Sequence, residues 1–196
     1  DGCNGNRSAV QWTATYTGQV RVLVDRQNCN TNGTCAPVWI TCSLNDDRCT
    51  ATPLTVAATC SNTTGSNNGA TSTTGVTSPS CSNYAGGDVW YSFLAPASGQ
   101  VAITTSTVSG SSLTDGAMAV YAASTCSSAF TELDCNDDSP SGGTMPYLAL
   151  SGLTSGTRYY IRFWEYGNNA FGAFNICVTT PAAAADDDPC AGTTLT

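Results

Sequence analysis

Hydrophobic and polar positions alternate most regularly over residues 88–104. Val89, Tyr91 and Phe93 occupy every second position there, and alternation of β-branched and aromatic residues is typical of a β-strand. Turn-forming proline, serine and glycine follow at residues 96–99, and the alternation then resumes. The stretch therefore predicts two strands joined as a β-hairpin.

Two internal repeats indicate how the chain is divided. Residues 11–24 are a weaker copy of the hairpin pattern, since both run from a tryptophan to Gly-Gln-Val and into a strand. Residues 46–49 and 187–190 share an Asp-Asp-X-Cys sequence, and each leads to a Leu-Thr pair. The repeats predict that residues 1–44 are the later part of one β module. They also predict that residues 189–196 are the first strand of another.

The middle of the chain predicts one complete all-β module at residues 45–179. About eight short strands separated by turn signals are typical of a β-sandwich or a jelly-roll-like fold. The segment 61–80 is poor in apolar residues and predicts a long loop. The partial β module at 1–44 precedes this sandwich, and a linker at 180–188 and a lone strand at 189–196 follow it. The expected strands lie at residues 53–56, 88–104 (the hairpin), 115–121, 131–133, 147–150, 158–164 and 173–178.

The composition narrows the function classes. Only 10% of the 196 residues are charged, the net charge is −8, and the chain has six arginines but no lysine or histidine. The basic patch that nucleic-acid binding needs is therefore absent, as are the side chains that general acid–base catalysis most often uses. The sequence has no Gly-X-Ser-X-Gly motif and no apolar run of about 20 residues. We therefore expect neither an enzyme nor a membrane span.

The chain has 11 cysteines, which predicts a disulfide framework and an exported protein. The lack of histidine and of any Cys-X-X-Cys pair disfavours zinc. The chain starts without methionine or a signal peptide, so we expect a mature part of a protein that is extracellular or at the cell surface. Spacing alone leaves the connectivity open. Short spacing favours Cys126–Cys135 and Cys29–Cys35, each of which would close a local hairpin. Cys60–Cys81 would join the two ends of the long loop, and Cys49–Cys177 would join the first strand to the last.

Acidic residues gather at the ends of the predicted strands, where the loops of a sandwich can converge. Carboxylates in such clusters are ligands that Ca²⁺ prefers, so calcium is the cofactor that the sequence suggests. The alternative is that these residues are solvated turn residues, because aspartate favours turns by bonding its own backbone. The candidate ligands are Asp46, Asp47, Asp115, Asp137 and Asp138.

Three asparagines, Asn6, Asn32 and Asn62, match the Asn-X-Ser/Thr glycosylation sequon. Such matches also arise by chance in a chain rich in serine, threonine and asparagine.

Aromatic residues in the predicted strand at 158–164 fall on both faces of that strand. Tyr160 and Trp164 share one face, and Tyr159 and Phe163 share the other. One face must belong to the core. An exposed aromatic row on the other would favour binding of a polysaccharide, whereas core on one side and ordinary surface on the other is the alternative.

Several motifs carry a resemblance to a known family. They are Asn-Asp-Asp-Arg-Cys at 45–49, Gly-Asp-Val-Trp-Tyr-Ser-Phe at 87–93, Asp-Gly-Ala-Met-Ala-Val-Tyr at 115–121, Cys-Asn-Asp-Asp at 135–138 and Tyr-Tyr-Ile-Arg at 159–162. On these residues the chain resembles the pre-peptidase C-terminal-like β-sandwich modules that are repeated in secreted proteins of Bacteroidetes type. The resemblance covers residues 45–179 and, as the back half of a related module, 1–43. It implies a secreted accessory or structural module without a catalytic motif.

Two functions from different classes follow. The first is a structural protein that assembles with itself, head to tail, into a fibre or surface layer by β-strand addition. In this hypothesis residues 189–196 pair with the next chain, and Leu195 takes the position that Leu54 has in the complete module. The second is a carbohydrate-binding accessory module of a secreted hydrolase or adhesin. The assembly hypothesis places Cys190, Thr193 and Leu195 of one chain against Cys42, Val20 and Val22 of the next. Cys190 matches Cys49, and the expected partner of Cys49, Cys177, matches Cys42, so Cys190 is expected to bond to Cys42 or, failing that, to Cys3 of the next chain. The alternative is that the same strand pairing occurs within one longer polypeptide.

Overall fold

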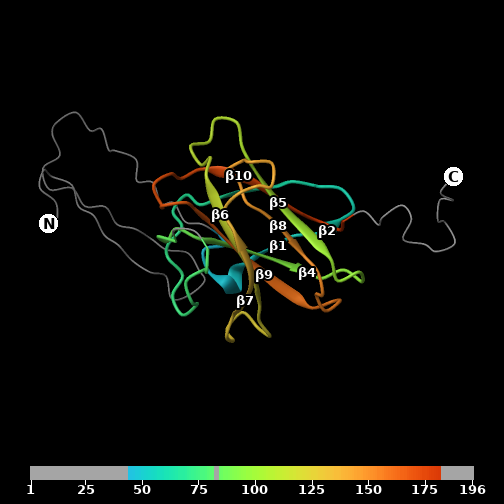
Figure 1. The fold of residues 1–196 in the computed structure, drawn as a ribbon. Coiled ribbons are helices and arrows are strands. Elements are labelled where there is room, and N and C mark those ends of the chain that lie inside the picture. The colour runs from blue at the N-terminus through green and yellow to red at the C-terminus, as the bar shows by residue number, and fades with distance from the viewer. Residues whose placement is uncertain (1–43, 82–83, 182–196) are drawn as a thin grey trace, which may run out of the picture. The chain divides into compact units, whose positions relative to one another are not determined.

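The computed structural model of the chain describes residues 44–81 and 84–181 (Figure 1). The predicted module at 1–44, except for Leu44, and the predicted strand at 189–196 lie outside the described residues. The described elements are the 3₁₀ helix η1 (Arg48–Thr50) and the strands β1 (Thr52–Pro53), β2 (Val56–Ala57), β3 (Thr63–Ser66), β4 (Val89–Leu94), β5 (Val101–Thr107), β6 (Gly116–Ala122), β7 (Thr131–Asn136), β8 (Tyr147–Leu150), β9 (Arg158–Glu165) and β10 (Ala173–Thr179).

The described strands form two β-sheets, which confirms the predicted β-sandwich (Figure 1). The first sheet has the strand order β1-β4-β9-β6-β7. The second has the order β2-β10-β5-β8, and β3 also pairs with β10. β1 and β2 run parallel to their partners, whereas the other described pairs are antiparallel.

The predicted strand at residues 53–56 is instead divided between the two sheets. β1 pairs with Tyr91 and Ser92 in the first sheet, whereas β2 pairs with β10 in the second. Leu54 lies between them with its side chain buried, and its backbone N–H donates to the carbonyl of Ser92 at 2.7 Å. The segment thus crosses from sheet to sheet, and two-residue strands are too short for alternation to reveal that crossing.

The predicted hairpin at 88–104 is also wrong, although both of its strands exist. β4 lies between β1 and β9, whereas β5 lies between β10 and β8 in the opposite sheet. The turn between them has Gly99 at φ 63°, and its N–H donates to the carbonyl of Pro96 at 3.0 Å. Both strands direct apolar side chains such as Phe93 and Val101 into the same core. Alternation identifies a strand and its buried face but not its pairing partner.

A hydrophobic core fills the space between the two sheets. It contains the alternating residues of β4, β5, β9 and β10 from which the strands were predicted, and it includes stacked rings of Phe163 and Phe174 with centroids 3.8 Å apart. Its other large members include Leu54, Tyr91, Phe93, Ile103, Leu113, Met118, Val120, Met145, Leu148, Leu153, Tyr159, Ile161 and Ile176.

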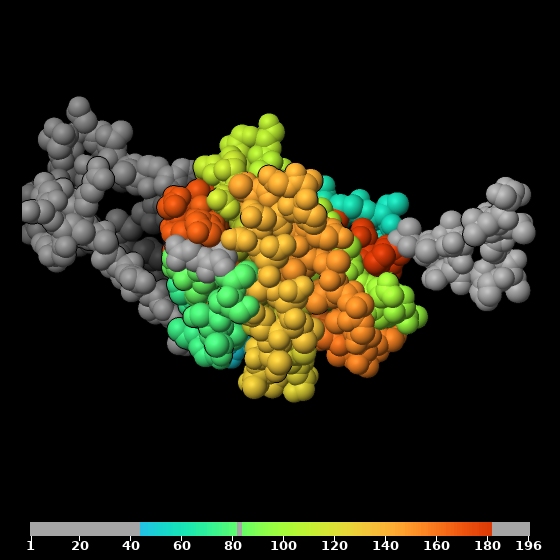
Figure 2. Space-filling view, in the orientation of Figure 1, coloured from blue at the N-terminus to red at the C-terminus, as the bar shows by residue number. Residues whose placement is uncertain are grey.

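A second core covers the outer face of the first sheet. Its centre holds Trp90, Tyr121, Tyr160 and Trp164, and all four are at most 6% exposed. Residues 71–81, called the strap below, lie over this face together with Tyr84 and Phe130. Figure 2 shows the strap, in green, against the yellow-to-orange segment that includes β7. The first sheet is therefore buried on both faces, and the aromatic face considered for polysaccharide binding belongs to a core.

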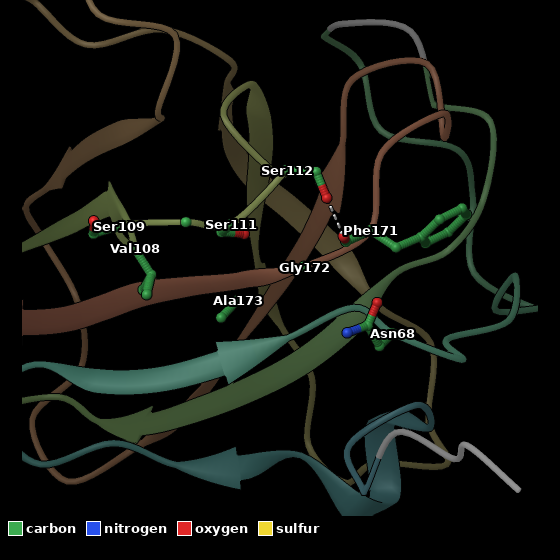
Figure 3. Close-up of a pocket in the computed structure, with 9 residues that line it drawn as sticks. Asn68, Val108, Ser109, Ser111, Ser112, Phe171, Gly172 and Ala173 are labelled. Carbon is green, nitrogen blue, oxygen red and sulfur yellow. Dashed lines mark hydrogen bonds between the residues drawn. The ribbon is translucent and has the colours of Figure 1, made fainter. Parts of the chain in front are cut away.

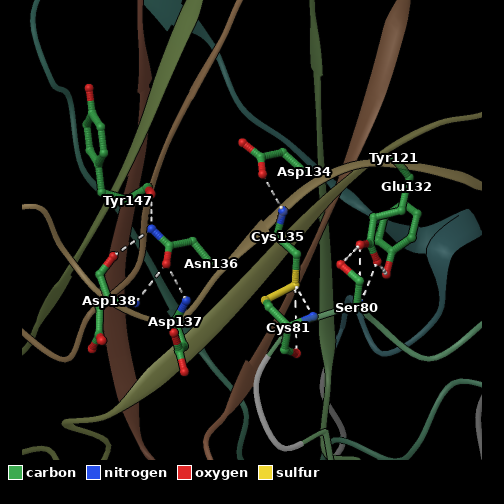
Figure 4. Close-up of a disulfide and its surroundings, with 10 residues drawn as sticks. All are labelled: Ser80, Cys81, Tyr121, Glu132, Asp134, Cys135, Asn136, Asp137, Asp138 and Tyr147. Atoms are coloured by element: carbon green, nitrogen blue, oxygen red, sulfur yellow. Dashed lines mark hydrogen bonds between the residues drawn. A yellow bond between two sulfur atoms is a disulfide. The ribbon is translucent and has the colours of Figure 1, made fainter.

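Three disulfides join the cysteines of the described residues, and their pairing differs from the prediction. The bonded pairs are Cys49–Cys126, Cys60–Cys177 and Cys81–Cys135, and Figure 4 shows the last of these. The predicted pairs Cys126–Cys135, Cys60–Cys81 and Cys49–Cys177 are therefore wrong, and Cys29–Cys35 lies outside the described residues.

Sheet neighbours explain the observed pairing. Each disulfide joins segments 54 to 117 residues apart in the sequence. Cys60 follows β2, and its partner Cys177 lies on β10, with which β2 pairs. Cys81 ends the strap and bonds to Cys135 of β7. A rule based on short spacing cannot identify such pairs because they form only when the sheets do.

The pairing also removes the reason for the predicted Cys190–Cys42 bond. That bond was inferred from the match of Cys190 to Cys49 and from an expected partner in Cys177. Cys49 bonds to Cys126 instead, so the analogy no longer leads to Cys42. The other predicted interface residues, Val20, Val22, Thr193 and Leu195, lie outside the described residues.

Candidate functional site

Loops from separate parts of the chain meet at one end of the sandwich, called the loop end below. β5 ends and β10 begins there, because Thr107 pairs with Phe174. The loops that follow β3, β5 and β9 enclose an open pocket of about 350 Å³ (Figure 3). The pocket is lined by Asn68, Val108, Ser109, Gly110, Ser111, Ser112, Phe171, Gly172 and Ala173.

Close contact between two of these loops shapes the pocket. A Cβ atom at Gly172 would lie 3.2 Å from the backbone nitrogen of Leu113 and 3.3 Å from that of Ser112. Glycine therefore lets the backbone of the β9–β10 loop approach the β5–β6 loop. The hydroxyl of Ser112 donates to the carbonyl of Phe171 at 2.7 Å across this contact (Figure 3).

The pocket combines one aromatic ring with small polar groups. Phe171 keeps 45% of its surface exposed, and Tyr166 of the same loop keeps 41%. Serine hydroxyls and an asparagine amide supply hydrogen-bond donors and acceptors, and none of the described residues that line the pocket is charged. Such a surface suits a ligand with an apolar face and many hydroxyl groups.

Sequence analysis did not predict this site. Phe171 stands in the stretch Gly-Asn-Asn-Ala-Phe-Gly at 167–172, which has the composition of a loop. An aromatic residue in such a stretch is a usable signal for an exposed ring. The serines at 109–112 come from a loop about 60 residues earlier, and only the fold brings the two segments together.

The predicted calcium ligands do not converge on one site. The Asp46 carboxylate accepts the hydroxyl of Thr71 at 2.9 Å, and Asp47 caps η1 by accepting the Cys49 N–H at 2.7 Å. Among the described residues, no group of three or more acidic or cysteine side chains is arranged to hold a metal ion. Calcium stays a prediction, and the melting temperature with and without a chelator tests it.

The other three predicted ligands, Asp115, Asp137 and Asp138, share an acidic region with Glu165. Burial and, after it, the negative charges of Glu165, Asp138 and Asp137 raise the pKa of Asp115 above its ordinary value. Asn136 accepts hydrogen bonds from the backbone N–H groups of both Asp137 and Asp138 (Figure 4). The region gives the loop end a negative charge.

Of the predicted glycosylation sites, only Asn62 lies within the described residues. It is exposed immediately before β3, whereas Asn6 and Asn32 lie outside. All three stay predictions.

Comparison with known proteins identifies the sandwich. Residues 44–178 match a protein family described as galactose binding domain-like and associated with the type IX secretion system. The chain belongs to this galactose binding domain-like family. Residues 1–46 match a second family, described as a domain of unknown function. No curated protein matches the chain.

The solved structures that are similar to the chain include the pre-peptidase C-terminal domain of a collagenase from Bacillus anthracis, with 12% sequence identity and a TM-score of 0.40. The matched region covers 65% of this chain and 93% of that domain.

The family match is to a binding-type domain. The association with type IX secretion and the three described disulfides indicate an extracellular or surface protein. Within the described residues, no helix has the length and apolar character needed to cross a membrane. An accessory extracellular module is the function class that these findings support.

Proposed function

We propose that the galactose binding domain-like sandwich binds a polysaccharide at the loop-end pocket. The observation that carries this proposal is an open pocket lined by serines and an asparagine, with the exposed Phe171 at its edge and its ring directed away from Ser109 and Ser111 (Figure 3). Sugar rings present an apolar face that stacks on an aromatic ring, and their hydroxyls bond to serine and amide groups. A pocket open at the surface also admits an inner unit of a long polymer.

Charge favours a neutral polysaccharide over an anionic one. The net charge is −8, and Asp115, Glu165, Asp137 and Asp138 give the loop end a negative field. A uronic acid or sulfated polymer would be repelled by this field, most strongly at low ionic strength.

Affinity electrophoresis with neutral and acidic polysaccharides tests the proposal. Phe171→Ala is expected to weaken binding about tenfold, since an aromatic anchor at the centre of a site carries much of the affinity. The matched control is Leu94→Ala, because Leu94 is 52% exposed and lies at the opposite end of β4. Equal binding by wild type and Phe171→Ala would contradict the proposed site.

Head-to-tail assembly remains a second candidate, and one observation favours it. The described chain begins beside β4 at the loop end, where the Asn45 carbonyl accepts the Trp90 N–H at 2.8 Å. The last described residues lie at the opposite end of the sandwich, where the Thr180 N–H donates to the carbonyl of Ala57 at 2.9 Å. The first and last described residues thus lie at opposite ends of the sandwich, which is compatible with head-to-tail addition.

Deletion of residues 189–196 tests the assembly hypothesis. Electron microscopy is expected to show filaments from the full chain and none from the deleted one. Filaments that persist after the deletion would rule out strand addition by this segment. A monomeric full chain that binds a polysaccharide would leave carbohydrate binding as the function.

A further inference from the structure

Asn67 holds the loop that carries the exposed Phe171. The residue follows β3 directly, and its side chain is fully buried. Its amide oxygen accepts the N–H of Gly172 at 2.8 Å, and its amide nitrogen donates to the carbonyl of Ala170 at 3.2 Å. The Asn67 N–H also donates to the carbonyl of Gly172 at 3.3 Å. One buried residue thus bonds to the backbone on both sides of Phe171.

A second loop holds the backbone of Phe171 itself. The hydroxyl of Ser112 donates to the carbonyl of Phe171 at 2.7 Å. Residues 170–172 are therefore fixed by hydrogen bonds from the loops that follow β3 and β5. Phe171 stays 45% exposed although its backbone is anchored.

Fixing the backbone matters for binding because ordering a loop and a side chain costs free energy at the moment of association. A ring on a free loop would lose its motion when a sugar stacks on it. A ring on an anchored loop has lost most of that motion before the ligand arrives, which strengthens binding without a new contact.

We propose that Asn67 is a positioning residue that orients Phe171 for its ligand. The inference rests on the proposed polysaccharide site and deepens it. The amide of Asn67 supplies both the acceptor for Gly172 and the donor for Ala170. The variant Asn67→Asp tests this dual role, because a carboxylate keeps the shape and the acceptor but removes the donor.

The experiment uses the full chain with 4-fluorophenylalanine at position 171. Asn67→Asp and Ser112→Ala are each expected to broaden or split the fluorine resonance in the absence of ligand. Each is also expected to weaken binding of the polysaccharide that the wild type binds, by about two- to tenfold. Ser112 is exposed, so Ser112→Ala keeps the test valid if the buried variant does not fold.

Asn45→Asp is the matched control. Asn45 is another buried amide, at 7% exposed, and it donates to the carbonyl of Trp90 at 2.8 Å, away from residues 170–172. This control is expected to lower the melting temperature but to leave the fluorine resonance and the affinity unchanged.

The outcomes separate this inference from the proposed function. A single sharp resonance and wild-type affinity in both Asn67→Asp and Ser112→Ala would overturn the inference alone. A wild type that binds no polysaccharide, while both variants still disorder the ring, would overturn the proposed function and support the anchoring of Phe171 by Asn67.

Discussion

Arg162 and Asp88 form an ion pair whose two side chains are fully buried under the strap, with Nε and Oδ2 3.0 Å apart. Arg162 lies in the middle of the aromatic outer face of the first sheet, and its guanidinium stacks 4.0 Å from the centroid of the Tyr84 ring. Asp88 also accepts the N–H of Thr73 at 3.0 Å, so the pair connects β4, β9 and the strap. Burial lowers the pKa of Arg162, but Asp88 and Tyr84 oppose that effect and the net pKa is raised. The arginine therefore stays charged in the folded protein.

Breaking this ion pair should strongly destabilise the sandwich. Arg162→Met leaves the Asp88 carboxylate buried without its cation, which is expected to cost about 3–5 kcal/mol of unfolding free energy. Chemical denaturation followed by circular dichroism measures the loss. The double variant Asp88→Asn/Arg162→Met removes both charges and should be more stable than Arg162→Met alone. A double variant that is the less stable of the two would contradict this account.

The Cys81–Cys135 disulfide should hold the strap in place. The C81S/C135S variant is expected to lose protection against hydrogen exchange in residues 71–81, because the end of the strap is then fixed by weaker bonds from Ser80 to Glu132. Loss of the cross-link should also lower stability by about 2–5 kcal/mol. Mass spectrometry of exchanged peptides locates the change.

C60S/C177S is the matched control for the strap. Its disulfide joins the chain after β2 to β10 in the second sheet. It should therefore lower stability without selectively exposing residues 71–81. Equal loss of strap protection in both variants would show that the strap follows global unfolding.

Gly116 should tolerate no side chain. A Cβ atom there would lie 2.7 Å from the ring of Phe163 and 3.2 Å from Cδ of Pro146, so Gly116→Ala overfills the core. Thermal unfolding should show a loss of about 1–3 kcal/mol. Gly143→Ala is the control, because the nearest atom to its Cβ would lie 3.8 Å away. A stable Gly116→Ala variant would mean that the ring of Phe163 moves freely.

Asp115→Asn should stabilise the protein at neutral pH. The folded-state pKa of Asp115 is raised by burial first and by neighbouring carboxylates second. A carboxyl whose folded pKa exceeds its unfolded value contributes stability below the unfolded pKa, about 3.9, and loses it as the pH rises through the folded pKa. The gain in melting temperature should thus be present near pH 7 and absent below about pH 3.5. A gain that is equal at both pH values would contradict an electrostatic cause.

The sequence by itself determined the fold class and several of the strands. β4, β5, β6 and β9 were predicted because side chains that alternate along a strand leave a period-two pattern in any chain that buries one face. The five motifs from 45–49 to 159–162 carried the family resemblance, since reading them needs no knowledge of contacts.

Only the tertiary structure decided which segments meet. β4 and β5 belong to opposite sheets, and Cys135 bonds to Cys81 and not to Cys126, because both outcomes depend on partners far away in the sequence. The strap has few apolar residues, yet it covers the outer face of the first sheet. Alternation identified that face as aromatic but could not show what packs against it. The loop-end pocket likewise forms from segments that are far apart in the sequence. Phe171, Ser112 and Asn67 lie on three separate loops, and the sandwich alone brings these loops within hydrogen-bonding distance.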